Sequence, residues 1–271
     1  KKIMEIHLIL GYFGAILIGV VLGLIGGGGS ILTLPVLVYL FGIEPVIATA
    51  YSLFIVGVAA VAGTLKNMSQ KLVDFKTALI FALPAFIAVY LTRRYLVPSL
   101  PDPLLSLGDF SLTKDVGIMV FFAIIMVLAS VSMIRDRRKE AHANSENNEP
   151  QYNYPLIVLE GFVVGVLTGI VGAGGGFLII PALVLLAKLP MKKAVATSLL
   201  IIAIKSLIGF IGDIQVIEID WMFLSVFALL SVVGIFIGVR LNQIVPGQKL
   251  KKGFGWFVLV MGVFIVLREL L

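Results

Sequence analysis

Apolar runs of about 20 residues follow one another along almost the whole chain. An α-helix needs a run of that length to cross a membrane, whereas the strands of a membrane barrel would appear as segments of about ten residues with alternating polarity. Of the 271 residues, 60% are apolar and 13% are charged, compared with about 25% charged residues in soluble domains. The sequence therefore excludes an ordinary soluble domain or a disordered chain, and it predicts an all-α polytopic membrane protein.

The apolar segments form two groups of five, and one hydrophilic stretch separates them. That stretch, 135–154, has the composition of a solvated linker. We expect a first transmembrane repeat at 1–134, a cytoplasmic polar linker at 135–154 and a second transmembrane repeat at 155–271. The expected segments are 6–25, 31–41, 46–65, 77–97 and 116–134, followed by 155–171, 177–187, 194–211, 221–239 and 254–267.

A shift of 146 residues superposes the two halves. Gly26 then meets Gly172, Pro35 meets Pro181 and Ser52 meets Ser198, and 17 of the 45 positions from 19 to 63 are identical without gaps. Apolar composition explains part of this agreement, but the shared Gly, Pro and Ser positions favour an internal duplication.

The charges of the loops predict that the two halves have inverted topology. Five crossings in each half would turn the second half upside down, and the Arg- and Lys-rich linker should face the cytoplasm. The basic loops 66–76, 188–193 and 240–252 then fall inside, while the acidic loops 98–114 and 212–220 fall outside. Lys1 and Lys2 are exceptions, because they fall outside. Re-entrant short segments would give the same sides, so the charges leave that alternative open.

Each half contains a glycine-rich run, at 26–29 and 172–176, followed by a short apolar segment. Short, glycine-interrupted segments at matching positions of inverted repeats indicate a transporter site near the membrane midplane. Helix N-termini present unpaired N–H groups and partial positive charge, so two converging N-termini would bind an anion, and Ser30 is a candidate cap for the first one. The alternative is that the glycines only allow close helix packing. We favour that alternative for Gly19, Gly23, Gly165 and Gly169.

Lys205 is the most informative single residue, because a lysine in the middle of a spanning helix costs about 2.5–3.5 kcal/mol. Ser198, Ile202, Lys205 and Gly209 share one helical face, which should point to the protein interior or to a water-filled cavity. The alternative is a lysine that reaches the interface or forms a structural pair. The corresponding residue of the first half is Ala59, so the site would be asymmetric.

Other polar residues have less specific interpretations. The hydroxyl groups of Thr49, Ser52, Thr197 and Ser198 would either line the pathway or bond to the preceding turn. We interpret Arg93 and Arg94 as anchors at the outer end of a span, and the alternative is that they attract anions electrostatically. The sequence has no cysteine and no recognisable nucleotide-binding or hydrolase motif, and we expect neither an enzyme nor a cofactor or metal.

The two glycine runs open similar motifs, GGGGSILTLP at 26–35 and GAGGGFLIIP at 172–181, and each is followed by A-x-A-x-S-L. This pair resembles the sulfite exporter TauE/SafE family, also called the toluene-sulfonate uptake permease family. The resemblance covers nearly the whole chain. It implies an inner-membrane permease for sulfur-containing anions such as sulfite, sulfonates or sulfoacetate, while the residues alone indicate only an anion or a small polar solute.

We therefore expect a multi-pass secondary transporter that works by alternating access. Its partners would be a small anionic substrate and the lipid bilayer, with no nucleic acid. The sequence leaves open whether the protein forms a homodimer. Two rival interpretations are an anion channel of the same fold and a membrane protein that only binds partners. The candidate substrate-binding residues are Gly26, Gly27, Gly28, Gly29, Ser30, Ser52, Gly172, Gly174, Gly175, Gly176, Thr197, Ser198 and Lys205.

Overall fold

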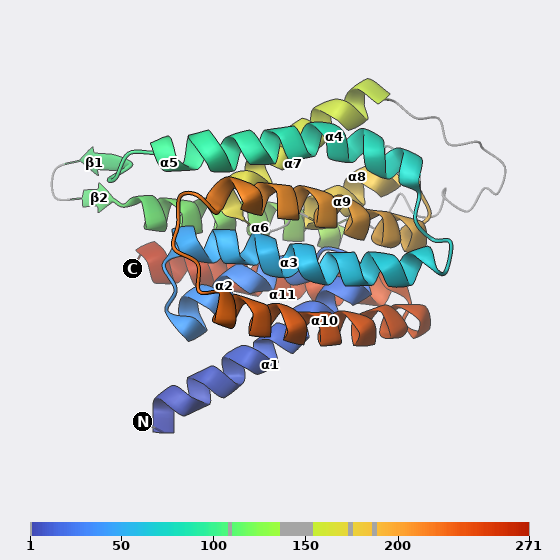
Figure 1. The fold of residues 1–271 in the computed structure, drawn as a ribbon, viewed down its shortest axis with the longest axis horizontal. Helices are drawn as coiled ribbons and strands as arrows, with labels where there is room; N and C mark the ends of the chain where they lie inside the picture. The colour runs from blue at the N-terminus through green and yellow to red at the C-terminus, as the bar shows by residue number, and fades with distance from the viewer. Residues whose placement is uncertain (1, 108–109, 136–153, 173–175, 186–188, 271) are drawn as a thin grey trace.

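A computed structural model describes residues 2–107, 110–135, 154–172, 176–185 and 189–270. Long helices make up most of this part of the chain (Figure 1). The elements are α1 (Lys2–Ile25), α2 (Gly29–Phe41), α3 (Pro45–Met68), α4 (Phe75–Leu91), the π-helix η1 (Thr92–Leu96), α5 (Val97–Ser99), β1 (Leu105–Leu107), β2 (Phe110–Leu112), α6 (Lys114–Arg135), α7 (Tyr154–Val171), α8 (Gly176–Leu185), α9 (Met191–Asp213), α10 (Trp221–Ile244) and α11 (Gly247–Leu270).

The ten expected apolar segments all appear as helices, but helices also extend into all five expected loops, and two of these loops differ most from the prediction. The acidic loop 98–114 contains the short antiparallel hairpin of β1 and β2. The basic stretch 240–252 is largely helical, because α10 continues to Ile244 and α11 begins at Gly247. Polar residues at the end of a spanning helix leave the apolar core of the bilayer and can stay helical, so hydropathy alone ends such helices too early. The proposed linker lies almost entirely outside the described residues.

Four helical segments of the described chain are long and apolar enough to cross a membrane: Pro45–Met68, Phe75–Ser99, Met191–Asp213 and Trp221–Ile244. Their outward faces carry large apolar side chains, such as Leu79 on α4 and Leu229 on α10. An exposed apolar surface of this extent would be unstable in water and matches a lipid environment. The protein is an all-α polytopic membrane protein.

Helices α3 and α9 lie side by side at the centre of the bundle and run in opposite directions (Figure 1). At one end, the backbone N–H of Asp74 donates to Thr197 Oγ1 over 2.9 Å. At the other end, the backbone N–H of Asp220 donates to the Tyr51 hydroxyl over 2.7 Å. The shift of 146 residues relates Asp74 to Asp220 and Tyr51 to Thr197, so both ends of the central pair are fixed by corresponding residues.

Glycines allow the neighbouring helices to pack closely. A Cβ atom on Gly19 of α1 would overlap the carbonyl oxygen of Ser231 on α10, and one on Gly165 of α7 would overlap that of Ala85 on α4. These two contacts are again related by the shift of 146 residues. The packing interpretation of these glycines is confirmed, and α1 pairs with α10 as α7 pairs with α4.

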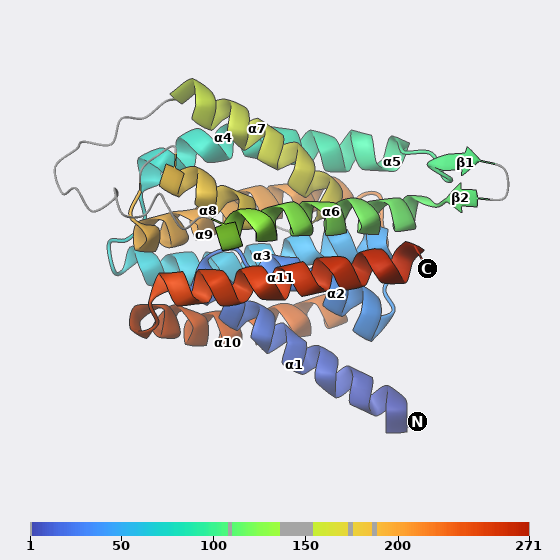
Figure 2. The ribbon, with the colours of Figure 1, turned by 180° about the vertical axis from the view of Figure 1, so that it is seen from behind.

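The two ends of the bundle differ in their charged residues, although each end carries both signs. The hairpin and both chain ends lie at one end, and Figure 2 shows the same arrangement from behind. We call this the hairpin end. By their positions in the elements, its acidic residues include Glu44, Asp102, Asp115, Glu218 and Asp220, and it also carries Lys2, Lys114 and Arg268. The opposite end, which we call the basic end, carries Lys66, Lys71, Lys192, Lys193, Arg240 and Lys252.

Candidate anion-binding site

The two glycine-rich runs meet inside the bundle. Helix α2 begins at Gly29 after its N-cap Gly28, and α8 begins at Gly176. A Cβ atom on Gly27 would overlap the backbone of Gly176, and a Cβ atom on Gly176 would overlap Gly27. The N-termini of the two short helices therefore approach each other, as the glycine pattern predicts.

Each run also rests on the central helix of the opposite half. Gly26 has a φ of 76° and packs against Val195 of α9, while Gly172 has a φ of 68° and packs against Thr49 of α3. Only glycine adopts this left-handed conformation at little cost, so these residues let the chain leave one helix and enter the next. Ser198 Oγ donates to the carbonyl of Gly26 over 2.7 Å and fixes the first run.

The cap predicted for Ser30 is wrong. The N-cap of α2 is Gly28, with no side-chain hydrogen bond, and Ser30 lies inside the helix. Helix α2 therefore begins at a glycine that has no side chain to cap it. Gly29 packs against the backbone of α1 at Ile18. Gly174 and Gly175 lie outside the described residues.

Lys205 is fully buried in the middle of α9. Its Nζ donates to Thr168 Oγ1 over 2.8 Å, and Thr168 lies four residues before Gly172 on α7. No ion pair to Lys205 is found among the described residues. The interior position predicted for the face of Ser198, Ile202, Lys205 and Gly209 is confirmed, since all four are buried.

Three buried hydroxyl groups differ in what they contact. Ser52 Oγ on α3 and Ser206 Oγ on α9 have no hydrogen-bond partner among the described residues. Unsatisfied buried hydroxyls are costly and call for a ligand, a water or a change of conformation. Thr197 Oγ1 instead accepts the N–H of Asp74, which favours a structural role for this candidate.

A second polar cluster surrounds Arg93, and the position predicted for this residue is wrong. Arg93 is 1% exposed and is not an outer anchor. Its Nε lies 2.8 Å and 2.9 Å from the two carboxylate oxygens of Asp213, a buried ion pair. Its Nη1 donates to Thr49 Oγ1 over 2.8 Å and to the carbonyl of Gly169 over 3.3 Å, while Nη2 has no partner among the described residues.

The comparisons with known proteins identify the family. The model of the family described as sulfite exporter TauE/SafE matches residues 12–265. The chain belongs to the sulfite exporter TauE/SafE family. This TauE/SafE protein is similar to a probable membrane transporter protein of Xylella fastidiosa strain 9a5c. The two are 28% identical over 93% of this chain and 92% of the relative. Another similar protein is the probable membrane transporter protein YunE of Bacillus subtilis, 28% identical over 92% of this chain and 91% of the relative. No solved structure matches significantly.

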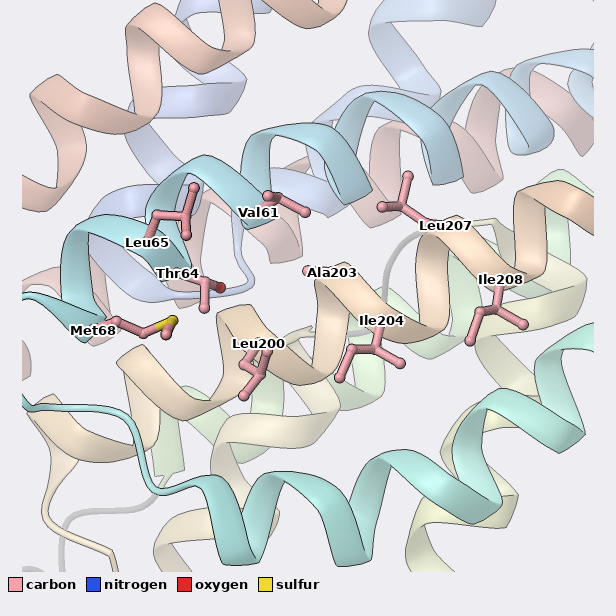
Figure 3. A pocket seen from close by; sticks show the side chains of 9 residues that line it. All are labelled: Val61, Thr64, Leu65, Met68, Leu200, Ala203, Ile204, Leu207 and Ile208. Atoms are coloured by element: carbon pink, nitrogen blue, oxygen red, sulfur yellow. The ribbon is translucent and has the colours of Figure 1, made fainter.

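A separate groove of the TauE/SafE protein is unsuited to an anion. Figure 3 shows it between α3 and α9, with a volume of about 420 Å³. Thr64 is its one polar lining residue among the described residues, and its hydroxyl already donates to the carbonyl of Ala60. The groove is open and apolar, so it fits lipid contact. The lining residues are Val61, Thr64, Leu65, Met68, Leu200, Ala203, Ile204, Leu207 and Ile208.

The charged cluster of the TauE/SafE protein had a weak signal in its sequence. Arg93 lies near the end of the apolar segment that begins at Phe75, 18 positions earlier. Asp213 lies near the end of a similar segment, so hydropathy assigns both residues to the membrane interface. The π-helix η1 changes the helical phase at this point, and such local irregularities often occur at functional sites. In the described ranges, no three His, Cys, Asp or Glu residues lie close enough together to hold a metal ion.

Proposed function

We propose that this protein is a secondary transporter for small sulfur-containing oxyanions such as sulfite, sulfonates or sulfoacetate. The observation that carries the proposal is the contact between Gly27 and Gly176, where the N-termini of α2 and α8 approach each other. Family membership supports membrane transport, and the resemblance to sulfite exporters supports the substrate class. The membrane would be the cell inner membrane.

Two kinds of positive potential favour an anion here. The helix N-termini contribute N–H donors and about half a positive charge each. Lys205, in its protonated form, contributes a positive charge on the neighbouring helix, and its described partner Thr168 is neutral. In a site with little water these charges act strongly on an oxyanion. The hydroxyl groups of Ser52 and Ser206, which have no hydrogen-bond partner in the described part of the chain, would help to orient it.

Alternating access would use the two halves of the chain as moving parts. Corresponding helices such as α3 and α9 run in opposite directions and make corresponding contacts at positions 146 apart. Inverted halves of this kind can rock around a fixed site and expose it to each side in turn. The absence of a nucleotide-binding motif from the sequence favours an ion or substrate gradient as the driving force.

Counterflow in proteoliposomes tests the proposal. Vesicles loaded with unlabelled sulfite should accumulate radiolabelled sulfite transiently and saturably, and gluconate-loaded vesicles should not. A thermal-shift series with sulfite, sulfate, thiosulfate and small sulfonates would identify the preferred anion, because a ligand of the native state raises the Tm. The absence of both counterflow and stabilisation with every one of these anions would overturn the proposal.

The two rivals give different results. An anion channel would conduct without saturable counterflow. A protein that only binds partners through its central stretch would show no flux, and a transporter should retain flux after deletion of 141–149.

A further inference from the structure

The buried ion pair of Arg93 and Asp213 occupies a place where four segments of the chain meet. Arg93 comes from η1, Asp213 from the end of α9, Thr49 from the start of α3 and Gly169 from the end of α7. This cluster lies toward the hairpin end of the bundle from the meeting glycines. Both central helices, α3 and α9, contribute to this cluster, and so does α7, which leads into the second glycine run.

We propose that Arg93 is a second anion-binding residue on the transport path, and that the carboxylate of Asp213 holds its place until the substrate replaces it. This inference rests on the proposed function. It adds a site for the same sulfur oxyanions between the glycine runs and the hairpin end.

The arginine is equipped to bind such an anion. Guanidinium donates parallel hydrogen bonds to a carboxylate or to an oxyanion of sulfur with the same geometry. Arg93 is 1% exposed, and its Nη2 is buried without a partner among the described residues. Its bonding capacity is therefore incompletely used by Asp213, Thr49 and Gly169.

Neighbouring residues connect this cluster to the first site. Thr168, which accepts from Lys205, directly precedes Gly169, which accepts from Arg93. Thr49, the other acceptor for Arg93, packs against Gly172 at the start of the second glycine run. An anion that leaves Arg93 would thus meet residues that also shape the site of Lys205.

The corresponding positions of the other half argue against a purely structural pair. Shifted by 146, Arg93 corresponds to Val239, and Asp213 corresponds to Asn67. Asn67 bonds within its own helix to the carbonyl of Gly63, and Val239 is buried. The other half therefore has neutral residues at these two positions, and a buried ion pair is often no more stabilising than apolar residues of similar volume.

Removal of the competing carboxylate should tighten anion binding. We expect Asp213→Asn to bind sulfite or sulfate at least tenfold more tightly than the wild type, measured as the anion dependence of the Tm of the purified protein. The matched control is Asp220→Asn, the same substitution at a helix cap of the same end, and its affinity should equal that of the wild type. The double variant Arg93→Met/Asp213→Asn should bind these anions no more tightly than the wild type.

Unchanged affinity in Asp213→Asn, beside a wild type that binds the anions, would overturn the role of Arg93 alone. A wild type that binds none of them would overturn the proposed function, whereas a gain confined to Asp213→Asn would still support Arg93 as an anion site. If Asp213→Asn does not fold, Arg93→Met/Asp213→Leu avoids a lone buried charge. It should fold and transport at least tenfold more slowly, and wild-type flux in that variant would overturn the inference.

Discussion

Gly27 and Gly176 touch backbone to backbone, although they belong to different halves of the chain. Each glycine lies at the entrance to a short helix, so their contact sets the distance between the two helix N-termini. Any side chain at either position would separate the two ends that the proposed anion site requires.

Gly27→Ala should therefore lower both stability and transport. The added methyl group would overlap the backbone of Gly176 rather than a movable side chain, and overpacking of this kind costs about 1–3 kcal/mol or more. The measurement is the Tm in detergent together with sulfite counterflow. Gly253→Ala is the control, because a Cβ there meets no atom within 4 Å, and it should leave both quantities at or slightly above wild type. Equal behaviour of the two variants would contradict the close contact.

Lys205→Met should reduce sulfite uptake at least tenfold while the protein still folds. Methionine has a similar length and removes the charge, so the variant avoids the cost of a buried cation and should be as stable as the wild type. Lys192→Met makes the same change at an exposed position of the same helix and should transport normally. Wild-type uptake by Lys205→Met would show that this cation serves structure alone.

Much of the fold could be predicted from the sequence because hydropathy and glycine act locally. The length of each apolar run defined the helices, and the two glycine runs marked where α2 and α8 begin. The extra charge of Lys205 also stood out, since an apolar helix rarely tolerates it. Each of these signals can be read from residues that are close together in the chain.

The cluster around Arg93 could not be predicted in this way. Its charge is neutralised by Asp213, which lies 120 positions further along the chain, and both residues sit near the ends of apolar segments. The same pattern describes two interfacial anchors. Only the tertiary pairing of η1 with α9 distinguishes a buried ion pair from two surface charges. The hairpin of β1 and β2 was missed because its strands have three residues each, which is too short for an alternating pattern to be recognised.

Asp74 and Asp220 should contribute equally to stability, because they cap corresponding helices in the same way. Asp74 Oδ1 accepts the N–H of Thr77, and Asp220 Oδ1 accepts the N–H of Phe223, both over 3.0 Å. Replacement of either aspartate by alanine should cost about 1 kcal/mol, whereas asparagine should preserve most of the cap. Thermal unfolding of the four single variants measures this. A large loss at one position only would contradict the equivalence of the two ends.

The ion pair of Arg93 and Asp213 should be strongly non-additive in its effect on stability. Asp213→Ala leaves a buried guanidinium without its carboxylate and should destabilise the protein by about 3–5 kcal/mol in anion-free buffer. Arg93→Met/Asp213→Leu removes both charges and should recover most of that loss, since apolar residues of similar volume replace such pairs at little cost. A double-mutant cycle on the Tm measures the coupling. Additive losses would mean that Arg93 and Asp213 do not compensate each other in the folded protein, and the pair could then not act as the resident counter-ion of an anion site.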